Sequence, residues 1–206
     1  MIKTNTNNCE FEVDMYDYSK NVSFKNKEVE IPKIYTINFF HYFDSDVSKY
    51  KPYFDVFEKA KESDEIIIYF QSGGGSVSTL NMFLNAMKMS KCKNVTARVN
   101  YAASAAAIMT LACNNIIFNE NSTLMLHTYS SCFWGKSQEI EADKKHNDLM
   151  CKKIIDKYCK KILSDQEIEQ MHNGKDFYFD EDEAIYRLKK YSQNKNKNKK
   201  IKGKRK

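Results

Sequence analysis

The chain has 206 residues, of which 42% are hydrophobic, enough for one domain with a sizeable core. Its net charge of +6 is uneven, because residues 189–206 carry +10 and the remainder therefore sums to −4. A basic tail on a slightly acidic body argues against a nucleic-acid-binding domain. No apolar run could span a bilayer, and the first residues lack the apolar core of a signal peptide. We therefore expect a cytoplasmic protein that does not enter a membrane.

The six cysteines form no Cys-x-x-Cys pair and no Cys/His cluster with zinc spacing. Without a signal peptide, reduced thiols are a better interpretation than disulfides. We expect neither a bound metal nor a cofactor.

Residues 1–32 are polar and are interpreted as an N-terminal arm that holds at most one or two short strands. After Pro32, short apolar segments alternate with segments of helical spacing. The segments typical of strands are 34–40, 65–70, 95–99, 116–118 and 123–127, and the 65–70 run is typical of a strand buried on both faces. Helices are expected at 47–60, at 80–89 and from about Ser104. This alternation predicts an α/β domain of parallel strands joined by right-handed crossovers.

From Ser137 onward the sequence is more polar and richer in charged residues. A long polar helix is predicted from Ser137 to about Cys159, and a helix of this kind commonly packs on a copy of itself or on a neighbour. The segments expected after it are a short helix opened by the capping box Ser164–Glu167 and ended by Gly174, an extended piece at 176–179, and a helix through Leu188. The Lys/Asn-rich tail 189–206 is expected to be disordered, so that the folded domain covers 33–188.

An apolar stretch of small side chains from Tyr101 to Cys113 contains the hydroxyl of Ser104. It follows a strand and favours a helix, so the first N–H groups of that helix are left unpaired beside Ser104. Such donors suit a negative charge that develops next to the serine oxygen. The simpler interpretation is a close-packed helix for which Ser104 is only the N-cap.

Ser104, His127 and Asp176 together form a possible nucleophile system, because all three fall at element boundaries. A serine nucleophile needs a base, and the base needs an acceptor that fixes its tautomer. Taken singly, the histidine could be a structural residue and the aspartate a turn cap. The N–H groups of Gly75 and Ala105 could form an oxyanion hole. The chain has no G-x-S-x-G motif and its order is Ser, His, Asp, which disfavours the α/β-hydrolases.

These motifs resemble those of the proteolytic subunit of the Clp protease, within the crotonase-like fold. Ser72–Val77 matches the oxyanion loop, Ala102-Ala-Ser104 the nucleophile motif, and Met125-Leu-His127 the strand that ends in the base. Lys175–Phe179 matches the segment that carries the acid, and the likeness covers about residues 33–188.

By this resemblance the chain would be a serine endopeptidase in which Ser104 attacks the peptide carbonyl, His127 is the base and Asp176 orients it. Gly75 and Ala105 would hold the oxyanion. The fold would be a spiral of strand–helix–strand units, and 137–159 would be the handle helix between two stacked seven-membered rings. A heptamer or double heptamer, fed by an ATP-driven unfoldase, is the implied assembly. The polar, Asn/Lys-rich composition and the short form of the chain are most similar to those of Clp-like proteases of phages and other viruses. Gly73 departs from the family's proline, and Ala105 and Ala106 from its Met-Gly.

Two alternatives stay open. The first is a catalytically inactive scaffold that keeps the fold and the oligomer. The second, weaker one is an acyl-CoA enzyme of the crotonase type, whose chemistry needs an oxyanion hole but no serine nucleophile.

Overall fold

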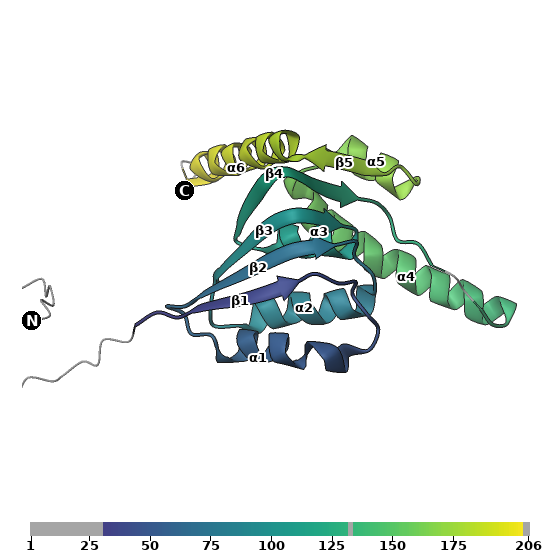
Figure 1. The fold of residues 1–206 in the computed structure, drawn as a ribbon. Helices are drawn as coiled ribbons and strands as arrows, with labels where there is room; N and C mark the ends of the chain where they lie inside the picture. Colours follow the sequence, from purple (N-terminus) through teal and green to yellow (C-terminus); the bar gives the residue numbers. More distant parts are fainter. Residues whose placement is uncertain (1–30, 132–133, 204–206) are drawn as a thin grey trace, which may run out of the picture. The chain divides into compact units, whose positions relative to one another are not determined.

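The computed structural model describes residues 31–131 and 134–203, with side chains through residue 196. From Pro32 onward these residues form one compact unit. Five strands make a single sheet in the order of the chain (Figure 1): β1 (Ile34–Phe39), β2 (Glu65–Ser72), β3 (Asn94–Ala103), β4 (Asn115–Leu126) and β5 (Phe177–Asp180). The first four are parallel, whereas β5 pairs antiparallel with β4. The predicted α/β domain with alternating strands and helices is confirmed.

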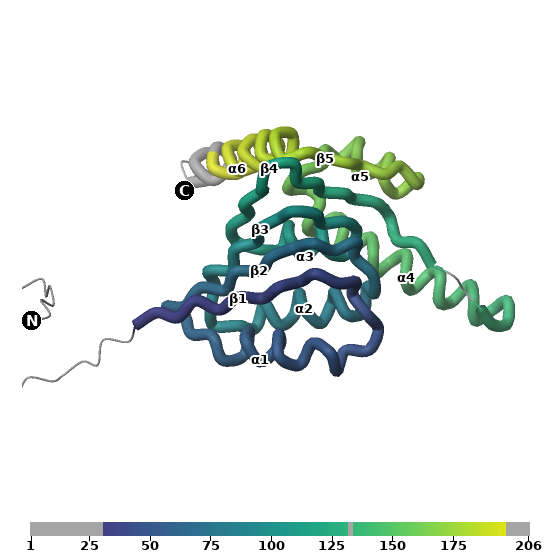
Figure 2. Tube along the Cα trace, viewed as in Figure 1, coloured from purple at the N-terminus to yellow at the C-terminus, as the bar shows by residue number. Residues whose placement is uncertain are grey.

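Three crossover helices cover one face of the parallel strands (Figures 1 and 2): α1 (Lys51–Lys59), which follows the short helix η1 (Val47–Tyr50), α2 (Val77–Met89) and α3 (Ala105–Ala112). The rings of Phe39 and Phe83 are fully buried in this core, with their centroids 5.4 Å apart. In β2 the side chains of Ile66 and Ile68 are fully buried, while Ile67 between them is half-buried. The expectation that β2 is buried on both faces is therefore wrong, because the helices cover only one face.

The remaining helices follow β4. The long helix α4 (Ser137–Tyr158) confirms the predicted polar helix and extends away from the sheet (Figure 1). Only Cys151 and Ile155 within it are buried. The helix η2 (Cys159–Lys161) and α5 (Asp165–His172) come next, and α5 opens with the expected capping box of Ser164 and Glu167. Helix α6 (Glu181–Gly203) packs against β4 and β5.

Two further expectations were wrong. The apolar segments 116–118 and 123–127 belong to one strand, β4, because the polar residues between them continue the extended chain and Asn121 takes up the irregularity with a φ of +61°. The tail is not disordered between Lys189 and Gly203, since α6 continues through it. Lysine and glutamine are good helix formers, and no proline interrupts the segment. The expected N-terminal arm lies outside the described residues.

Four of the six cysteines, Cys92, Cys113, Cys151 and Cys159, are free thiols and buried. Burial raises the pKa of Cys113 and Cys159 to about 12, so these thiols stay protonated at neutral pH. Within 31–131 and 134–203, no helix has the length and apolar character needed to cross a bilayer. The same residues contain no group of three or more His, Cys, Asp or Glu side chains arranged to hold a metal ion.

Helix α6 is attached to α5 through the guanidinium of Arg187. It donates to both carboxylate oxygens of Glu167 at 2.9 Å and to Glu183 at 2.6 Å, and it lies 5.0 Å from the centre of the Phe179 ring. This network fixes α6 and β5 to the rest of the domain.

We expect Arg187→Met to lower the free energy of unfolding by about 1–3 kcal/mol, because the variant leaves half-buried charged acceptors without their partner. Lys189→Met, an exposed change on the same helix, should stay within about 0.5 kcal/mol of the parent chain. Urea unfolding followed by circular dichroism measures both values, and equal stabilities of the two variants would contradict this role of Arg187.

Candidate active site

Ser104 lies at the sharp turn between β3, which ends at Ala103, and α3, which begins at Ala105. Its φ and ψ are +56° and −122°, a conformation that a residue with a Cβ adopts only under strain. Two backbone hydrogen bonds hold the turn: the Ser104 N–H donates to the Met125 carbonyl at 2.9 Å, and the Ile108 N–H donates to the Ser104 carbonyl at 3.1 Å. The turn is therefore fixed to both β4 and α3.

The hydroxyl of Ser104 does not cap α3. Ser104 occupies the N-cap position, but its side chain forms no hydrogen bond to the helix. Ser104 is thus the N-cap residue of α3, as the simpler interpretation expects, but its hydroxyl does not make the capping hydrogen bond. The hydroxyl is half-buried among buried alanines and lines a pocket, so it is available for chemistry.

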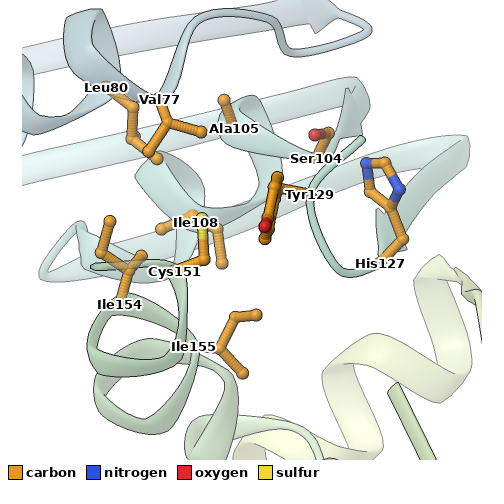
Figure 3. Close-up of a pocket in the computed structure, with 10 residues that line it drawn as sticks. All are labelled: Val77, Leu80, Ser104, Ala105, Ile108, His127, Tyr129, Cys151, Ile154 and Ile155. Atoms are coloured by element: carbon orange, nitrogen blue, oxygen red, sulfur yellow. The ribbon is translucent and has the colours of Figure 1, made fainter. Parts of the chain in front are cut away.

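His127 follows β4 directly and lines the same pocket as Ser104. Figure 3 shows its ring extending toward the side on which Ser104 lies. The structure thus brings together two residues that are 23 positions apart, because β3 and β4 are parallel neighbours whose carboxyl ends meet.

Asp176 precedes β5. The antiparallel ladder ends with Leu126 opposite Phe177, so Asp176 and His127 are the next residues beyond that pair. The carboxyl group is exposed, and Asp176 does not line the pocket. Within residues 31–131 and 134–203, no hydrogen bond joins the side chains of Ser104, His127 and Asp176. The backbone places the three residues at one end of the sheet, but their side chains do not form a hydrogen-bonded triad in this structure.

The glycine loop after β2 lies against the Ser104 turn. A Cβ at Gly74, whose φ is +93°, would come within 2.7 Å of the Ala103 carbonyl oxygen and of the Ser104 Cβ, and within 2.8 Å of the Ala105 nitrogen. Only glycine allows this approach. The loop therefore brings its backbone directly to the start of α3.

Gly75 is held from the opposite side. The Phe43 N–H donates to the Gly74 carbonyl, and the Ser76 N–H donates to the Phe43 carbonyl, both at 2.7 Å. These bonds make a parallel bridge between Phe43 and Gly75, in which the N–H of Gly75 points away from Phe43. Ser72, before the loop, donates through its hydroxyl to the His41 carbonyl at 2.6 Å. The segment 41–44 thus braces the loop, and the Gly75 N–H is directed to the β3 side.

Sequence reasoning missed the parts of the site that depend on packing. It selects Gly75 and overlooks Gly74, although a run of three glycines signals a close backbone approach. Tyr129, Cys151 and Ile155 line the pocket beside Ser104, and no motif distinguishes them. The contribution of α4 to the pocket could not be read from a helix whose sequence is mostly polar.

We expect Gly74→Ala to destabilise the protein more than Gly174→Ala. Both glycines have a positive φ, +93° and +96°, so each alanine should cost about 1–2 kcal/mol of backbone strain. A Cβ at Gly174 would meet no atom within 4 Å, whereas a Cβ at Gly74 meets the Ser104 turn, which should add about 1–3 kcal/mol. Denaturant unfolding of the two variants checks this, and equal losses would show that the loop is not packed on the turn.

Comparisons with known proteins agree with this architecture. The family model described as Clp protease matches residues 49–187, which span most of the domain and include Ser104, His127 and Asp176. Among solved structures, the chain is similar to a mutant of ClpP1 from Listeria monocytogenes, with a TM-score of 0.60 and 21% identity over 74% of this chain and 86% of that one. This likeness shows a shared fold. No curated protein sequence matches. Because the family model matches about two thirds of this chain, the chain belongs to the Clp protease family.

Proposed function

We propose that the protein is a serine-type endopeptidase in which Ser104 is the nucleophile. The observation that carries this proposal is the strained, uncapped Ser104 at the β3–α3 turn, sharing a pocket with His127. A turn that costs strain and leaves its hydroxyl without a capping bond is typical of a functional site. Membership of the Clp protease family supports the same reaction class.

In the proposed reaction, His127 removes the proton of the Ser104 hydroxyl as the oxygen attacks the peptide carbonyl. The tetrahedral intermediate collapses when His127 returns that proton to the leaving amine, and the amine product departs. A water molecule, deprotonated by His127, then releases the acyl group and restores the serine. Catalytic hydrogen bonds often tighten only when substrate is bound, so the open side-chain arrangement is compatible with this sequence.

Two backbone N–H groups would stabilise the oxyanion. Ala105 is the first residue of α3, so its N–H has no partner within the helix and lies at the positive end of the helix dipole. The N–H of Gly75 is directed to the same side by the bridge to Phe43. Because the main chain supplies both donors, the alanines at 105 and 106 do not impair the hole.

Asp176 would orient His127 by accepting a hydrogen bond from its ring. The β4–β5 register supports this role, since it makes Asp176 and His127 successive to the last pair of the ladder. The carboxylate is exposed in this structure and would have to turn toward the ring to accept that hydrogen bond.

The family also supports an assembly. We propose a homo-oligomeric ring, a heptamer or double heptamer, in which α4 serves as the handle between two rings. The mostly exposed surface of α4, with only Cys151 and Ile155 buried, leaves it available for such contacts. An ATP-driven unfoldase as partner, and a host cytoplasmic setting of the viral type, belong to this proposal as expectations from the family resemblance.

We expect a fluorophosphonate to label Ser104 covalently in the parent chain. Ser104→Ala should abolish labelling, and His127→Ala and Asp176→Asn should slow it by about 10⁴-fold, as in other triads. His146→Ala, an exposed histidine on α4, should label like the parent. Intact-mass spectrometry gives the rates, and light scattering gives the oligomer size. Rings that form without any labelling would identify the chain as an inactive scaffold.

We expect Gly75→Val to slow the same labelling by about 100–1000-fold, the usual cost of losing one oxyanion donor, because the larger residue displaces the N–H at position 75. The added side chain would meet the Phe43 backbone, and the φ of +133° disfavours any residue but glycine. Gly135→Val is the matched control, because Gly135 also has a positive φ, +152°, but lies before α4 and does not line the pocket. Labelling of Gly75→Val at the parent rate would refute the assigned oxyanion loop.

A further inference from the structure

The pocket beside Ser104 is narrow and mostly apolar. Only about 40 Å³ of its interior is open to the centre of a water molecule. Its apolar walls come from three helices, α2, α3 and α4, and consist of Val77, Leu80, Ala105, Ile108, Cys151, Ile154 and Ile155. For comparison, an engineered apolar cavity of about 150 Å³ binds benzene. A large substrate side chain therefore does not fit this pocket as it stands.

Tyr129 is the largest side chain that lines this pocket. Tyr129 lies two positions after His127 and is half-buried. Figure 3 shows its ring in the middle of the lining residues, with Ser104 and His127 on one side and Cys151 and Ile155 of α4 on the other. A ring in this place fills the space that would otherwise continue from the hydroxyl of Ser104 to α4.

A hydrogen bond holds this ring against α4. The Tyr129 hydroxyl donates to Asp148 Oδ1 at 2.5 Å, and Asp148 lies on α4 three residues before Cys151. This hydrogen bond raises the pKa of Tyr129 to about 12, so the phenol remains a donor throughout the neutral range. Because the bond lies at the surface, we assign most of the narrowing to the packed ring and the rest to the hydrogen bond.

We propose that Tyr129, held by Asp148, is a specificity-determining residue that restricts this pocket to small side chains such as alanine. The inference rests on the proposed function, because the pocket borders Ser104 and would receive the side chain of the residue whose carbonyl is attacked. A bulky side chain enters only after the Tyr129 ring swings out, which breaks the hydrogen bond to Asp148.

The test compares two peptidyl phosphonate probes that differ only in the side chain next to phosphorus, alanine or phenylalanine. The parent chain should label faster with the alanine probe, by about tenfold or more. Tyr129→Ala should reverse this preference. Tyr129→Phe keeps the ring and Asp148→Asn keeps a neutral acceptor, so both should change the ratio of the two labelling rates less. Asp143→Asn, an exposed change on the same helix, is the control and should keep the parental ratio. An unchanged ratio in Tyr129→Ala would overturn the proposal.

A second readout does not require catalysis. Cys151 lines the far side of the pocket and is only 8% exposed. If the ring of Tyr129 closes the pocket, Tyr129→Ala should raise the rate at which iodoacetamide alkylates Cys151, while the core thiols of Cys113 and Cys159 stay unreactive in the same sample. Peptide mapping by mass spectrometry separates the sites.

The two readouts distinguish the two proposals. Suppose that neither phosphonate labels any of the chains, but that alkylation of Cys151 is faster in Tyr129→Ala. The peptidase proposal then fails, and the role of Tyr129 in closing the pocket stands. If the parent chain labels but neither the probe ratio nor the Cys151 rate changes, the closing role fails and the peptidase proposal stands. If no chain labels and the Cys151 rate is unchanged, both fail.

Discussion

The strained backbone at Ser104 is the constraint on which the site depends. A positive φ at a residue with a side chain costs about 1–3 kcal/mol, and the protein keeps it because β4 and α3 hold the turn from two sides. The small residues around it are what make this possible, since Ala102 through Ala107, apart from Ser104 itself, are all buried and allow β3, the glycine loop and α3 to approach closely. This backbone conformation places the hydroxyl of Ser104 at the pocket that His127 also lines.

Most of the fold could be predicted because its elements carry local signals. The apolar runs at β1, β2 and β3 and the helical spacing of α2 and α4 indicate their type directly, and the capping box marks the start of α5. The continuity of β4 could not be predicted, because a non-glycine residue with a positive φ, Asn121, leaves no pattern in the neighbouring residues. The helical course of α6 beyond Leu188 was missed because its composition, rich in lysine and asparagine, is shared by disordered segments.

For the candidate site, the sequence indicates the chain positions but not the packing. Ser104, His127 and Gly75 fall after strands, and parallel strands bring their carboxyl ends together, so their convergence follows from topology. The partnership of Asp176 with the end of β4 depends on the antiparallel register of a four-residue strand, which no sequence pattern specifies. The pocket wall from α4 and the position of Tyr129 depend on how a mostly exposed helix meets the domain, and the two buried residues of α4 are too few to produce a clear periodicity.

The late position of Asp176 in the chain has a consequence for biosynthesis. The bridge between Phe43 and Gly75 ties the glycine loop to a segment near the beginning of the domain, while Asp176 enters through a strand near its end. A ribosome-bound fragment that stops short of β5 therefore contains the serine and the histidine but lacks the acid. In the proposed peptidase, the Ser104–His127–Asp176 set could therefore be complete only after β5 has been synthesised.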